Sequence, residues 1–337
     1  MTRLEVAAPY LIFLGAVRNP LDAKTGRGLV DWCPERCAGQ LRLPGSAVDL
    51  GLPELSPREA AAEGARTLVV GVAPLGGGLA PEWLAVFEEA LAAGLDIASG
   101  MHARLAEHPA LAAAARRHGR RLIDVRVPPA AIPLATGRRR TGRRLLTVGT
   151  DCCVGKKYTA LALARELAAR GVGATFRATG QTGILIAGGG IPIDAVVSDF
   201  VAGAAEALTP DAPPGHWDVV EGQGSLFHPA YAGVTLGLVH GTQPDLLLLC
   251  HEAGRTESDE YPGFAIPTLA EALRRYLEAA ALTNPGVAPL GVSLNTAALA
   301  PGERERALAA ARAETGLPCV DPLRGRGADE LDRKSVV

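Results

Sequence analysis

The sequence predicts an α/β protein with parallel sheets in two domains. Short hydrophobic runs alternate with Ala-, Leu- and Arg-rich stretches of helical period along most of the chain, a pattern typical of β-α-β units. The 337 residues correspond to two domains at roughly 150 residues each. A strand, a glycine-bounded loop and a helix in direct succession indicate where the second domain begins.

The overall composition limits the classes of partner. Acidic residues (36) and basic residues (34) nearly cancel to a net charge of −2, so the chain lacks the positive field with which proteins gather nucleic acid or anionic membranes. Hydrophobic residues make up 48%, which excludes a disordered chain. No window reaches the ~18 uninterrupted apolar residues of a membrane span. We therefore expect small-molecule partners, with no nucleic acid and no membrane.

The cysteines and the first residues predict a compartment. Six cysteines, two of them adjacent, do not show the regular spacing of an extracellular disulfide framework. The first residues also lack the basic and apolar regions of a secretory signal. We expect a cytoplasmic protein with reduced thiols. Cys33 and Cys37 are interpreted as thiols too, because no second Cys or His pair lies near enough in the sequence to complete a zinc site.

Residues 1–128 are expected to form the first domain. A polar, glycine-containing segment with Lys24 and Thr25 directly follows the first strand, and we interpret it as a loop that closes over a ligand and contacts the substrate. The expected strands are Tyr10–Leu14, Thr67–Val72, Leu95–Ala98 and Leu122–Val127, and the expected helices are Trp83–Ala93 and Ala103–His118.

Residues 129–144 are the expected linker, because prolines and then an arginine-rich run occur there without an apolar period. Such a run in a neutral chain is typically a solvated connector. The second domain is expected over 145–331, and residues 332–337 are expected to form a frayed tail. Its expected strands are Leu145–Val148, Gly173–Arg177, Trp217–Val220, Leu246–Cys250, Leu290–Leu294 and Pro318–Asp321.

A phosphate-binding loop is the most specific local motif. Two glycines bound a loop between a buried strand and an Ala-rich helix, and a lysine follows the second glycine, which is the order that a P-loop requires. The glycines let consecutive N–H groups face an anion, and the lysine and the helix N-terminus add positive charge. The residues predicted to bind cofactor phosphates are Gly149, Thr150, Asp151, Cys152, Val154, Gly155, Lys156, Lys157, Tyr158 and Thr159.

This loop departs from the standard P-loop in two ways. Five residues separate its glycines where the common motif has four, and in this respect it resembles the loop of dethiobiotin synthetases. Lys157 occupies the position of the Ser or Thr that normally holds Mg²⁺. Thr159 could replace that hydroxyl only if the helix began differently. The sequence thus disfavours ordinary Mg-ATP hydrolysis.

Polar residues follow other strands at their carboxyl ends, where open α/β sheets bind ligands. Arg177 begins a predicted substrate loop, and its guanidinium suits a carboxylate. It is a catalytic candidate together with Glu221 and His228. The other predicted substrate contacts of this loop are Thr179, Gly180, Gln181 and Thr182.

Acid–base groups are expected at the same edge. Glu221 directly follows a buried strand, where it could act as an acid or base or through a metal. His228 is a second candidate for the general base. Asn295 follows a later strand and is predicted to contact an adenine edge of the cofactor. No dedicated metal site is predicted.

Cys152 has two interpretations. The helix dipole and Lys156 are expected to lower its pKa, which would suit a role in which its thiol accepts an acyl group. Residues at this position of a P-loop more often supply only backbone N–H groups, and we favour that interpretation.

Taken together, these motifs resemble a bacterial and archaeal family of proteins with a domain of unknown function, to which the DgcN-type D-glutamate/D-aspartate N-acetyltransferases belong. The resemblance implies a Rossmann-like N-terminal domain joined to a P-loop NTPase-like domain similar to dethiobiotin synthetase. It extends over nearly the whole chain and rests on Lys24-Thr25, Pro81-Glu82-Trp83, the phosphate loop, Arg177–Gly183, Glu221–Ser225 and Val320–Arg324.

The resemblance implies transfer of an acetyl group from acetyl-CoA to the amine of an acidic D-amino acid. The phosphate loop would then hold CoA phosphates, in agreement with Lys157 at the magnesium-ligand position. An ATP- and Mg²⁺-dependent ligase or carboxylase is the alternative, and a nucleotide-binding regulatory protein is the second alternative. The expected substrate is a small molecule with a carboxylate and an amine, and we expect a homo-oligomer.

Overall fold

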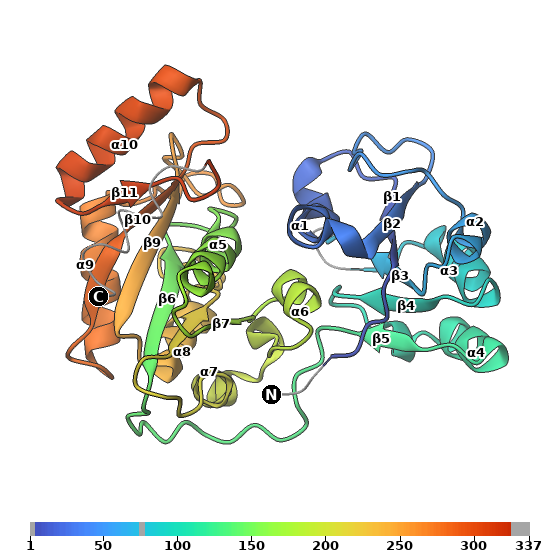
Figure 1. Cartoon of the computed structure of the whole chain (residues 1–337), viewed down its shortest axis with the longest axis horizontal. Coiled ribbons are helices and arrows are strands. Elements are labelled where there is room, and N and C mark those ends of the chain that lie inside the picture. The colour runs from blue at the N-terminus through green and yellow to red at the C-terminus, as the bar shows by residue number, and fades with distance from the viewer. Residues whose placement is uncertain (1–3, 74–77, 325–337) are drawn as a thin grey trace. The chain divides into compact units, whose positions relative to one another are not determined.

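The protein is described by a computed structural model that covers residues 4–73 and 78–324. It divides into two compact units. The N-terminal unit holds the described residues as far as Pro128 together with Gly180–Pro192, and the C-terminal unit holds Pro129–Thr179 and the residues from Ile193 onward. Each unit has its own sheet with parallel strands (Figure 1), which confirms the predicted α/β class. The expected tail at 332–337 lies outside the described residues.

The N-terminal unit is a five-stranded sheet in the order β2-β1-β3-β4-β5. Helices α1 and α6 contact each other, and α3 contacts both α2 and α4. Its strands are β1 (Tyr10–Gly15), β2 (Cys37–Arg42), β3 (Thr67–Val70), β4 (Asp96–Ser99) and β5 (Leu122–Asp124), and its helices are α1 (Lys24–Trp32), α2 (Pro57–Ala62), α3 (Trp83–Ala92), α4 (Pro109–His118) and α6 (Gln181–Ala187).

Several elements of this unit differ from the prediction, among them α2 and α6, which match no predicted helix. The segment expected to be a polar loop after β1 is the helix α1, and the edge strand β2 has no counterpart among the predicted strands. Gly26 within α1 approaches the sheet so closely that a Cβ would lie 2.9 Å from the Ile12 side chain, so here glycine serves packing and not a loop. Helix α4 begins only at Pro109, because proline is favoured in the first turn of a helix.

The C-terminal unit is a six-stranded sheet in the order β11-β10-β9-β6-β8-β7. Helix α5 packs on β6, β7 and β8, whereas α8 and α9 contact each other beside β6 and β9 (Figure 1). Its strands are β6 (Arg143–Gly149), β7 (Ala174–Arg177), β8 (Trp217–Val220), β9 (Leu246–Glu252), β10 (Ala288–Asn295) and β11 (Cys319–Val320), and its helices are α5 (Lys156–Ala169), α7 (Val201–Leu208), α8 (Ala232–Thr242), α9 (Leu269–Ala281) and α10 (Pro301–Thr315).

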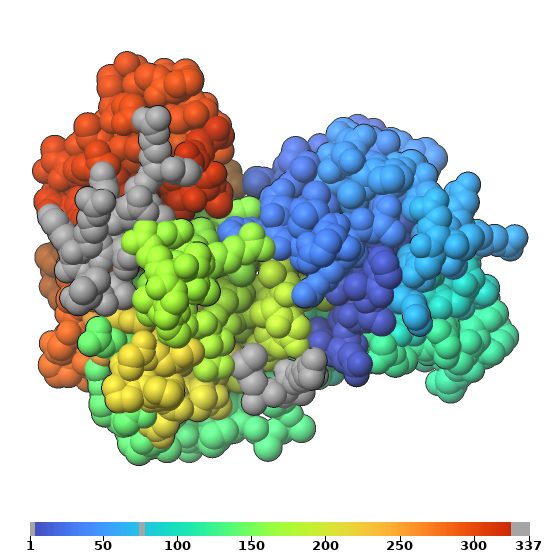
Figure 2. All heavy atoms as spheres, viewed as in Figure 1, coloured from blue at the N-terminus to red at the C-terminus, as the bar shows by residue number. Residues whose placement is uncertain are grey.

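The core of the C-terminal unit lies between α5 and the sheet. Leu163 and Leu167 of α5 pack with Leu145, Val219 and Leu248 from the three central strands. These side chains are buried on a continuous apolar face, as expected for a helix that covers a parallel sheet. Helix α10, by contrast, lies on the outside of the unit (Figure 2), with only Leu308 and Ala311 of its residues buried.

The arginine-rich run is expected to be a solvated connector, and for two of its residues that expectation is wrong. Arg140 is only 4% exposed and donates to the carbonyls of Glu206, Gly241 and Thr242 and to the hydroxyl of Thr209. Burial, with Arg144 nearby, lowers the pKa of Arg140 to about 10. Arg144, the second residue of β6, is also buried and donates to the carbonyls of Gln243 and Arg140. The end of the run therefore fixes the start of β6.

Two further observations concern the chain as a whole. Among the described residues, no helix combines the length and the apolar character that crossing a membrane requires. All six cysteines lie within the described ranges, and each is a free thiol.

Candidate functional site

The phosphate loop connects β6 to α5 and folds around the amino group of Lys156. Lys156 is 7% exposed, and its Nζ donates to the carbonyl oxygen of Asp151 at 2.7 Å. Gly155 precedes the helix with a φ of +104°, a conformation that glycine adopts without strain. A Cβ on Gly149 would lie 2.8 Å from Val154 and 3.0 Å from Lys156 Nζ. Both glycines therefore shape a tight loop at the N-terminus of α5, the geometry that suits an anion.

The carboxylate of Asp151 holds this loop to the segment after β9. It is 2% exposed and accepts from Arg255 Nη1 at 3.1 Å, from Ser258 Oγ at 3.2 Å and from the Asp259 amide at 3.1 Å. Burial alone would raise the pKa of Asp151, but the amides of Asp259 and Cys152 and the guanidinium of Arg255 outweigh it and lower that pKa. The negative charge of Asp151 is thus balanced by Arg255, and its hydrogen bonds hold the loop to the segment after β9.

The remaining hydroxyls of the loop point into the protein. Thr150 is hydrogen-bonded to His251 Nδ1 at 2.8 Å, and burial, with Arg255 nearby, lowers the pKa of His251. The Thr159 hydroxyl lies 2.8 Å from that of Ser293 on β10, since α5 begins at Lys156 and places Thr159 one turn into the helix. Thr159 therefore does not take the position of a P-loop magnesium ligand.

Lys157, at that position, lies over the ring of Tyr158, with its ammonium 5.1 Å from the ring centroid. The pair places a cation and an aromatic ring together in the first turn of α5. A lysine there adds positive charge where a standard P-loop would place a metal-binding hydroxyl.

Glu221 follows β8 directly and lies beside the phosphate loop. It is 3% exposed, and its Oε2 accepts from the Thr179 amide at 2.9 Å. The Thr179 hydroxyl in turn donates to the Glu221 carbonyl at 2.6 Å and accepts from Gln223 Nε2 at 3.0 Å. The next residue, Gly222, donates its N–H to Thr147 of β6. The predicted acid and one predicted substrate-loop residue thus form one buried network.

Arg177 ends β7 and is paired within the sheet. Its Nε donates to Asp218 Oδ1 at 2.7 Å, and both side chains are largely buried. Asp218 lies opposite Thr175 in the sheet register, two residues before Arg177. The guanidinium therefore reaches back from the carboxyl end of β7, where the substrate was expected.

The other predicted substrate residues belong to the N-terminal unit. Thr182 donates its hydroxyl to that of Thr25 at 3.2 Å, and both threonines are buried. Gln181 accepts from Arg126 at 2.8 Å, and Lys24 is exposed at the start of α1. Gly180 precedes α6, which packs on α1. The predicted substrate loop is thus divided between the two units, with Thr179 in one and Thr182 in the other.

Asn295 ends β10 and is engaged locally. Its Oδ1 accepts from the Ala297 amide at 3.1 Å, and its carbonyl accepts from the amide of Ala253 after β9. The side chain therefore stabilises the turn that follows the strand.

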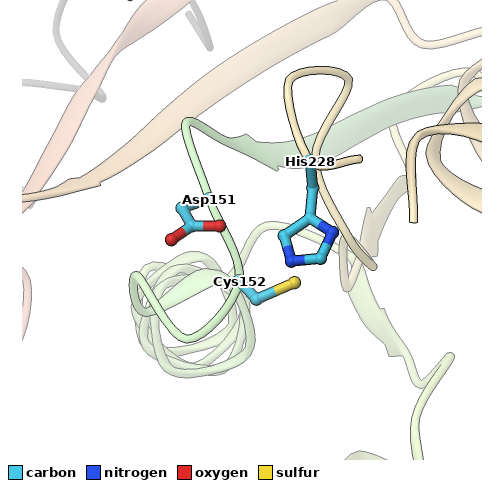
Figure 3. A group of neighbouring side chains, drawn as sticks. All are labelled: Asp151, Cys152 and His228. Carbon is cyan, nitrogen blue, oxygen red and sulfur yellow. The ribbon is translucent and has the colours of Figure 1, made fainter. Parts of the chain in front are cut away.

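His228 and Cys152 face each other across the mouth of the loop (Figure 3). His228 is 2% exposed and stacks on Tyr231 at 4.5 Å between ring centroids. One ring nitrogen of His228, the Cys152 Sγ and a carboxylate oxygen of Asp151 lie within 4.8 Å of one another. Burial raises the pKa of Cys152 to about 11, although Lys156 acts in the opposite direction. The expectation of a lowered pKa for Cys152 is therefore wrong.

These three side chains have the chemistry of metal ligands, but Asp151 does not suit a cation. Its two oxygens already accept from Arg255, Ser258 and Asp259. A bound cation would have to compete with the guanidinium for the same carboxylate, so the donor set does not fit a metal ion.

Several site residues could not be found by sequence reasoning. Tyr276 of α9 is fully buried, donates to the carbonyl of Gly149 at 2.7 Å and accepts from the Leu226 amide at 3.1 Å. It thereby joins the end of β6 to the segment that carries His228. Arg255 belongs to a polar cluster that directly follows a predicted strand, but the cluster carries no motif, and Ser258 lies beyond it. Nothing in their local sequence links them to a loop about a hundred residues away.

Comparison with known proteins places this architecture in a family. Residues 38–128 match the profile of a domain of unknown function described as the Rossmann-like domain of DUF1611, and residues 133–332 match its P-loop domain. The chain belongs to the DUF1611 family. This confirms the predicted Rossmann-like and P-loop pair.

Relatives of this DUF1611 protein match it nearly from end to end. A protein of Tritonibacter scottomollicae named D-glutamate N-acetyltransferase is 50% identical over 97% of this chain and 99% of its own length. A second protein of that name from a Pseudoalteromonas species is 43% identical over 97% and 98%. The crystal structure of a DUF1611 family protein from Anabaena variabilis superimposes with a TM-score of 0.87 at 35% identity, covering 96% of this chain and 98% of that one.

Proposed function

We propose that this chain is an N-acetyltransferase that moves an acetyl group from acetyl-CoA to the amine of D-glutamate. The observation that carries the proposal is the 50% identity to a D-glutamate N-acetyltransferase over almost the full length of both chains. A second relative of the same name at 43% identity supports it. The chain thus has both domains of proteins that bear this name.

The phosphate loop would bind the phosphates of CoA. Lys156, the first turn of α5 and the cation of Lys157 together favour a polyanion. Magnesium is not required for this role, which agrees with Lys157 at the usual metal-ligand position and with the Thr159 hydroxyl directed at Ser293.

The amine of the substrate must lose a proton before or as it attacks the acetyl carbonyl. Glu221 is the better candidate for this base, because a buried carboxylate beside the loop can accept a proton. His228 Nδ1 already accepts from the Ala230 amide at 3.2 Å. Arg177 is our candidate partner for a substrate carboxylate, for which its guanidinium would turn from Asp218 toward the carboxyl end of β7.

Binding measurements test the cofactor. Calorimetry with acetyl-CoA and with ATP, each with and without Mg²⁺, should show acetyl-CoA binding that does not depend on Mg²⁺. Lys156→Ala should abolish this binding. Arg170→Ala, which removes an exposed ion pair with Glu166 at the far end of α5, should leave it unchanged. Tight Mg²⁺-dependent ATP binding without affinity for acetyl-CoA would instead support a ligase.

Product formation tests the substrate. Release of free CoA thiol and formation of N-acetyl-D-glutamate should follow addition of D-glutamate to enzyme and acetyl-CoA. L-glutamate and D-aspartate are the matched acceptors that define stereochemistry and chain length. Absence of product with all three would refute the proposed function.

Two properties of the working enzyme complete the proposal. The six free thiols support an enzyme that works in the cytoplasm. We also propose a homo-oligomer, which light scattering of the purified chain would test.

A further inference from the structure

Cys152 is the thiol that the phosphate loop turns toward the protein. The adjacent Cys153 is exposed and has a φ of +56°, so the backbone reverses there and the two thiols have different environments. The Cys152 side chain points toward His228 (Figure 3). Its carbonyl accepts from Arg255 Nη1 at 3.1 Å, so the backbone on which the thiol stands is fixed by a contact that does not involve the sulfur.

The ring of His228 is held in one orientation. It stacks on Tyr231 with an interplanar angle of 19° and meets Tyr261 edge-on at 5.0 Å. Its Nδ1 accepts from the Ala230 amide. In the neutral ring the proton must therefore be on Nε2, because only one nitrogen carries it. His228 thus presents an N–H donor, and the expectation of a general base does not suit this tautomer.

That donor has no hydrogen-bond acceptor within the described part of the protein. Nε2 lies 3.8 Å from Glu260 Oε2, which is too long for a hydrogen bond, and Figure 3 shows this nitrogen facing the Cys152 sulfur. A buried N–H without an acceptor is costly and uncommon in native proteins. Its position beside a thiol indicates an acceptor that is present only when substrate is bound.

The acceptor that fits is the charge that develops when a thioester is attacked. Partial burial raises the pKa of the Cys152 thiol to about 11, so Cys152 becomes a nucleophile only when its proton is removed as the reaction proceeds. Glu260 contributes negative charge near the thiol, and its carboxylate, on a side chain that is 30% exposed, lies 3.8 Å from His228 Nε2. A carboxylate that can take the proton, an N–H donor for the resulting charge and a thiol are therefore grouped at the end of a phosphate loop.

We propose that Cys152 carries the acetyl group as an enzyme thioester between two half-reactions. The inference rests on the proposed acetyl transfer. In the first half-reaction Cys152 Sγ forms a bond to the acetyl carbon as the bond between that carbon and the CoA sulfur breaks. The thiol proton passes to Glu260 and then to the departing CoA sulfur. His228 Nε2–H donates to the carbonyl oxygen while it bears negative charge.

In the second half-reaction the neutral amine of the acceptor attacks the same carbonyl. A C–N bond forms, the bond to Cys152 Sγ breaks, and the proton that Glu221 takes from the amine is returned to Cys152. One thioester has replaced another in the first step, and an amide has replaced a thioester in the second, so neither step needs an oxidant, a reductant or ATP. The pattern is that of covalent catalysis by a cysteine.

The adjacent cysteines provide a matched pair of variants. Wild type, Cys152→Ala and Cys153→Ala are incubated with acetyl-CoA in the absence of any amino acid, quenched in acid and weighed by intact-protein mass spectrometry. Wild type and Cys153→Ala should gain the mass of one acetyl group, located on the peptide with Cys152 and released by hydroxylamine. Cys152→Ala should gain none. Its turnover with D-glutamate should fall by about 10³-fold or more.

A second measurement covers a thioester too short-lived to accumulate. The covalent route predicts exchange of labelled CoA into acetyl-CoA without acceptor, in wild type and in Cys153→Ala but not in Cys152→Ala. Acetyl-CoA binding by Cys152→Ala, measured by calorimetry, shows that the loop is intact. Absence of both adduct and exchange in an active wild type would overturn the inference, as would a Cys152→Ala enzyme that turns over within about threefold of Cys153→Ala.

The outcomes separate this inference from the proposed function. If wild type forms N-acetyl-D-glutamate while Cys152→Ala remains active, the function stands and the covalent route fails. If wild type gains the acetyl group or exchanges CoA but gives no product with D-glutamate, the covalent route stands and the acceptor assignment fails. One bound zinc per chain that is lost in Cys152→Ala would overturn the inference, because a metal-bound thiolate would not be available for attack.

Discussion

Gly222→Ala tests how closely the end of β8, where Glu221 lies, approaches the phosphate loop. Gly222 follows Glu221 and donates its N–H to Thr147 Oγ1 of β6 at 2.9 Å. A Cβ at this position would lie 1.8 Å from the Thr147 carbonyl oxygen and 3.0 Å from Lys156 Cδ. The first neighbour is backbone, so no rotation of a side chain can relieve the overlap.

The size of the effect follows from these distances. Real Cβ atoms essentially never come closer than 3.0 Å to another heavy atom, so the ends of β6 and β8 must separate by about 1.2 Å. Overpacking of a core costs about 1–3 kcal/mol when side chains can adjust, and a lost hydrogen bond adds about 1 kcal/mol. Because backbone must move here, we expect Gly222→Ala to lower the free energy of unfolding by about 3 kcal/mol or more.

Urea denaturation monitored by circular dichroism measures this change. Gly233→Ala is the control, since Gly233 lies in α8 and an added Cβ there would extend into open space. It should stabilise the protein by up to about 1 kcal/mol, because alanine is the better helix former. Acetyl-CoA binding should weaken by about tenfold in Gly222→Ala, because Lys156 is displaced, and should be unchanged in Gly233→Ala. A Gly222→Ala protein within about 1 kcal/mol of wild type would refute the close approach.

Three further changes test other parts of the C-terminal unit. Arg140→Met should cost about 3 kcal/mol of unfolding free energy, because four acceptors, three of them in buried hydrogen bonds, lose their donor. Arg138→Met, which breaks an exposed ion pair, should cost under about 1 kcal/mol, and equal costs in urea titration would contradict this. Tyr276→Phe should cost about 2 kcal/mol by the same measurement, since the hydroxyl bonded to the Gly149 carbonyl is lost; an unchanged midpoint would contradict it. Burial lowers the pKa of His251, so the stability due to its neutral ring is present above the unfolded pKa of about 6.5 and is lost as pH falls below it. His251→Gln should reduce the loss of unfolding free energy between about pH 7.5 and pH 5, and an unchanged loss would contradict the assignment.

The strand ends were predictable because the sheet is parallel. Trp217–Val220 is a strand with the bounds expected from its apolar run, and Glu221 follows it at the edge where β6 also ends. In a parallel sheet every carboxyl end lies on one side, so the placement of Arg177 and Asn295 at that edge follows from local sequence alone. The phosphate loop is equally local, since glycine spacing, the lysine and the helix are contiguous.

The partners of these residues could not be predicted in this way. Tyr276 reaches Gly149 across 127 residues, and Arg255 reaches Asp151 across 104. Each contact depends on how α9 and the segment after β9 pack on the sheet, which no short pattern encodes. The same limit explains Arg177. Its guanidinium suits a substrate carboxylate, but the neighbouring strand β8 carries Asp218, which forms an ion pair with it.

Composition misled at two places for physical reasons that the structure shows. A polar, glycine-containing segment indicates a loop, yet Gly26 makes α1 possible because it lets the helix lie against Ile12. An arginine-rich run indicates solvent exposure, yet Arg140 is buried because main-chain carbonyls at helix ends supply acceptors for its guanidinium. In both cases a tertiary contact outweighs the local preference.

The position of Thr159 bears on the choice between phosphoryl and acetyl transfer. A P-loop that transfers phosphoryl groups needs a hydroxyl on Mg²⁺ directly after its lysine, and here that position is Lys157. Thr159 could serve only if α5 began later, but the helix begins at Lys156 and the Thr159 hydroxyl is bonded to Ser293. To free it, that buried hydrogen bond would have to break and the first turn of α5 to unwind. The loop therefore has the glycines, lysine and helix N-terminus of a P-loop without its metal-binding hydroxyl, which suits a cofactor that is anchored by its phosphates and reacts through its thioester.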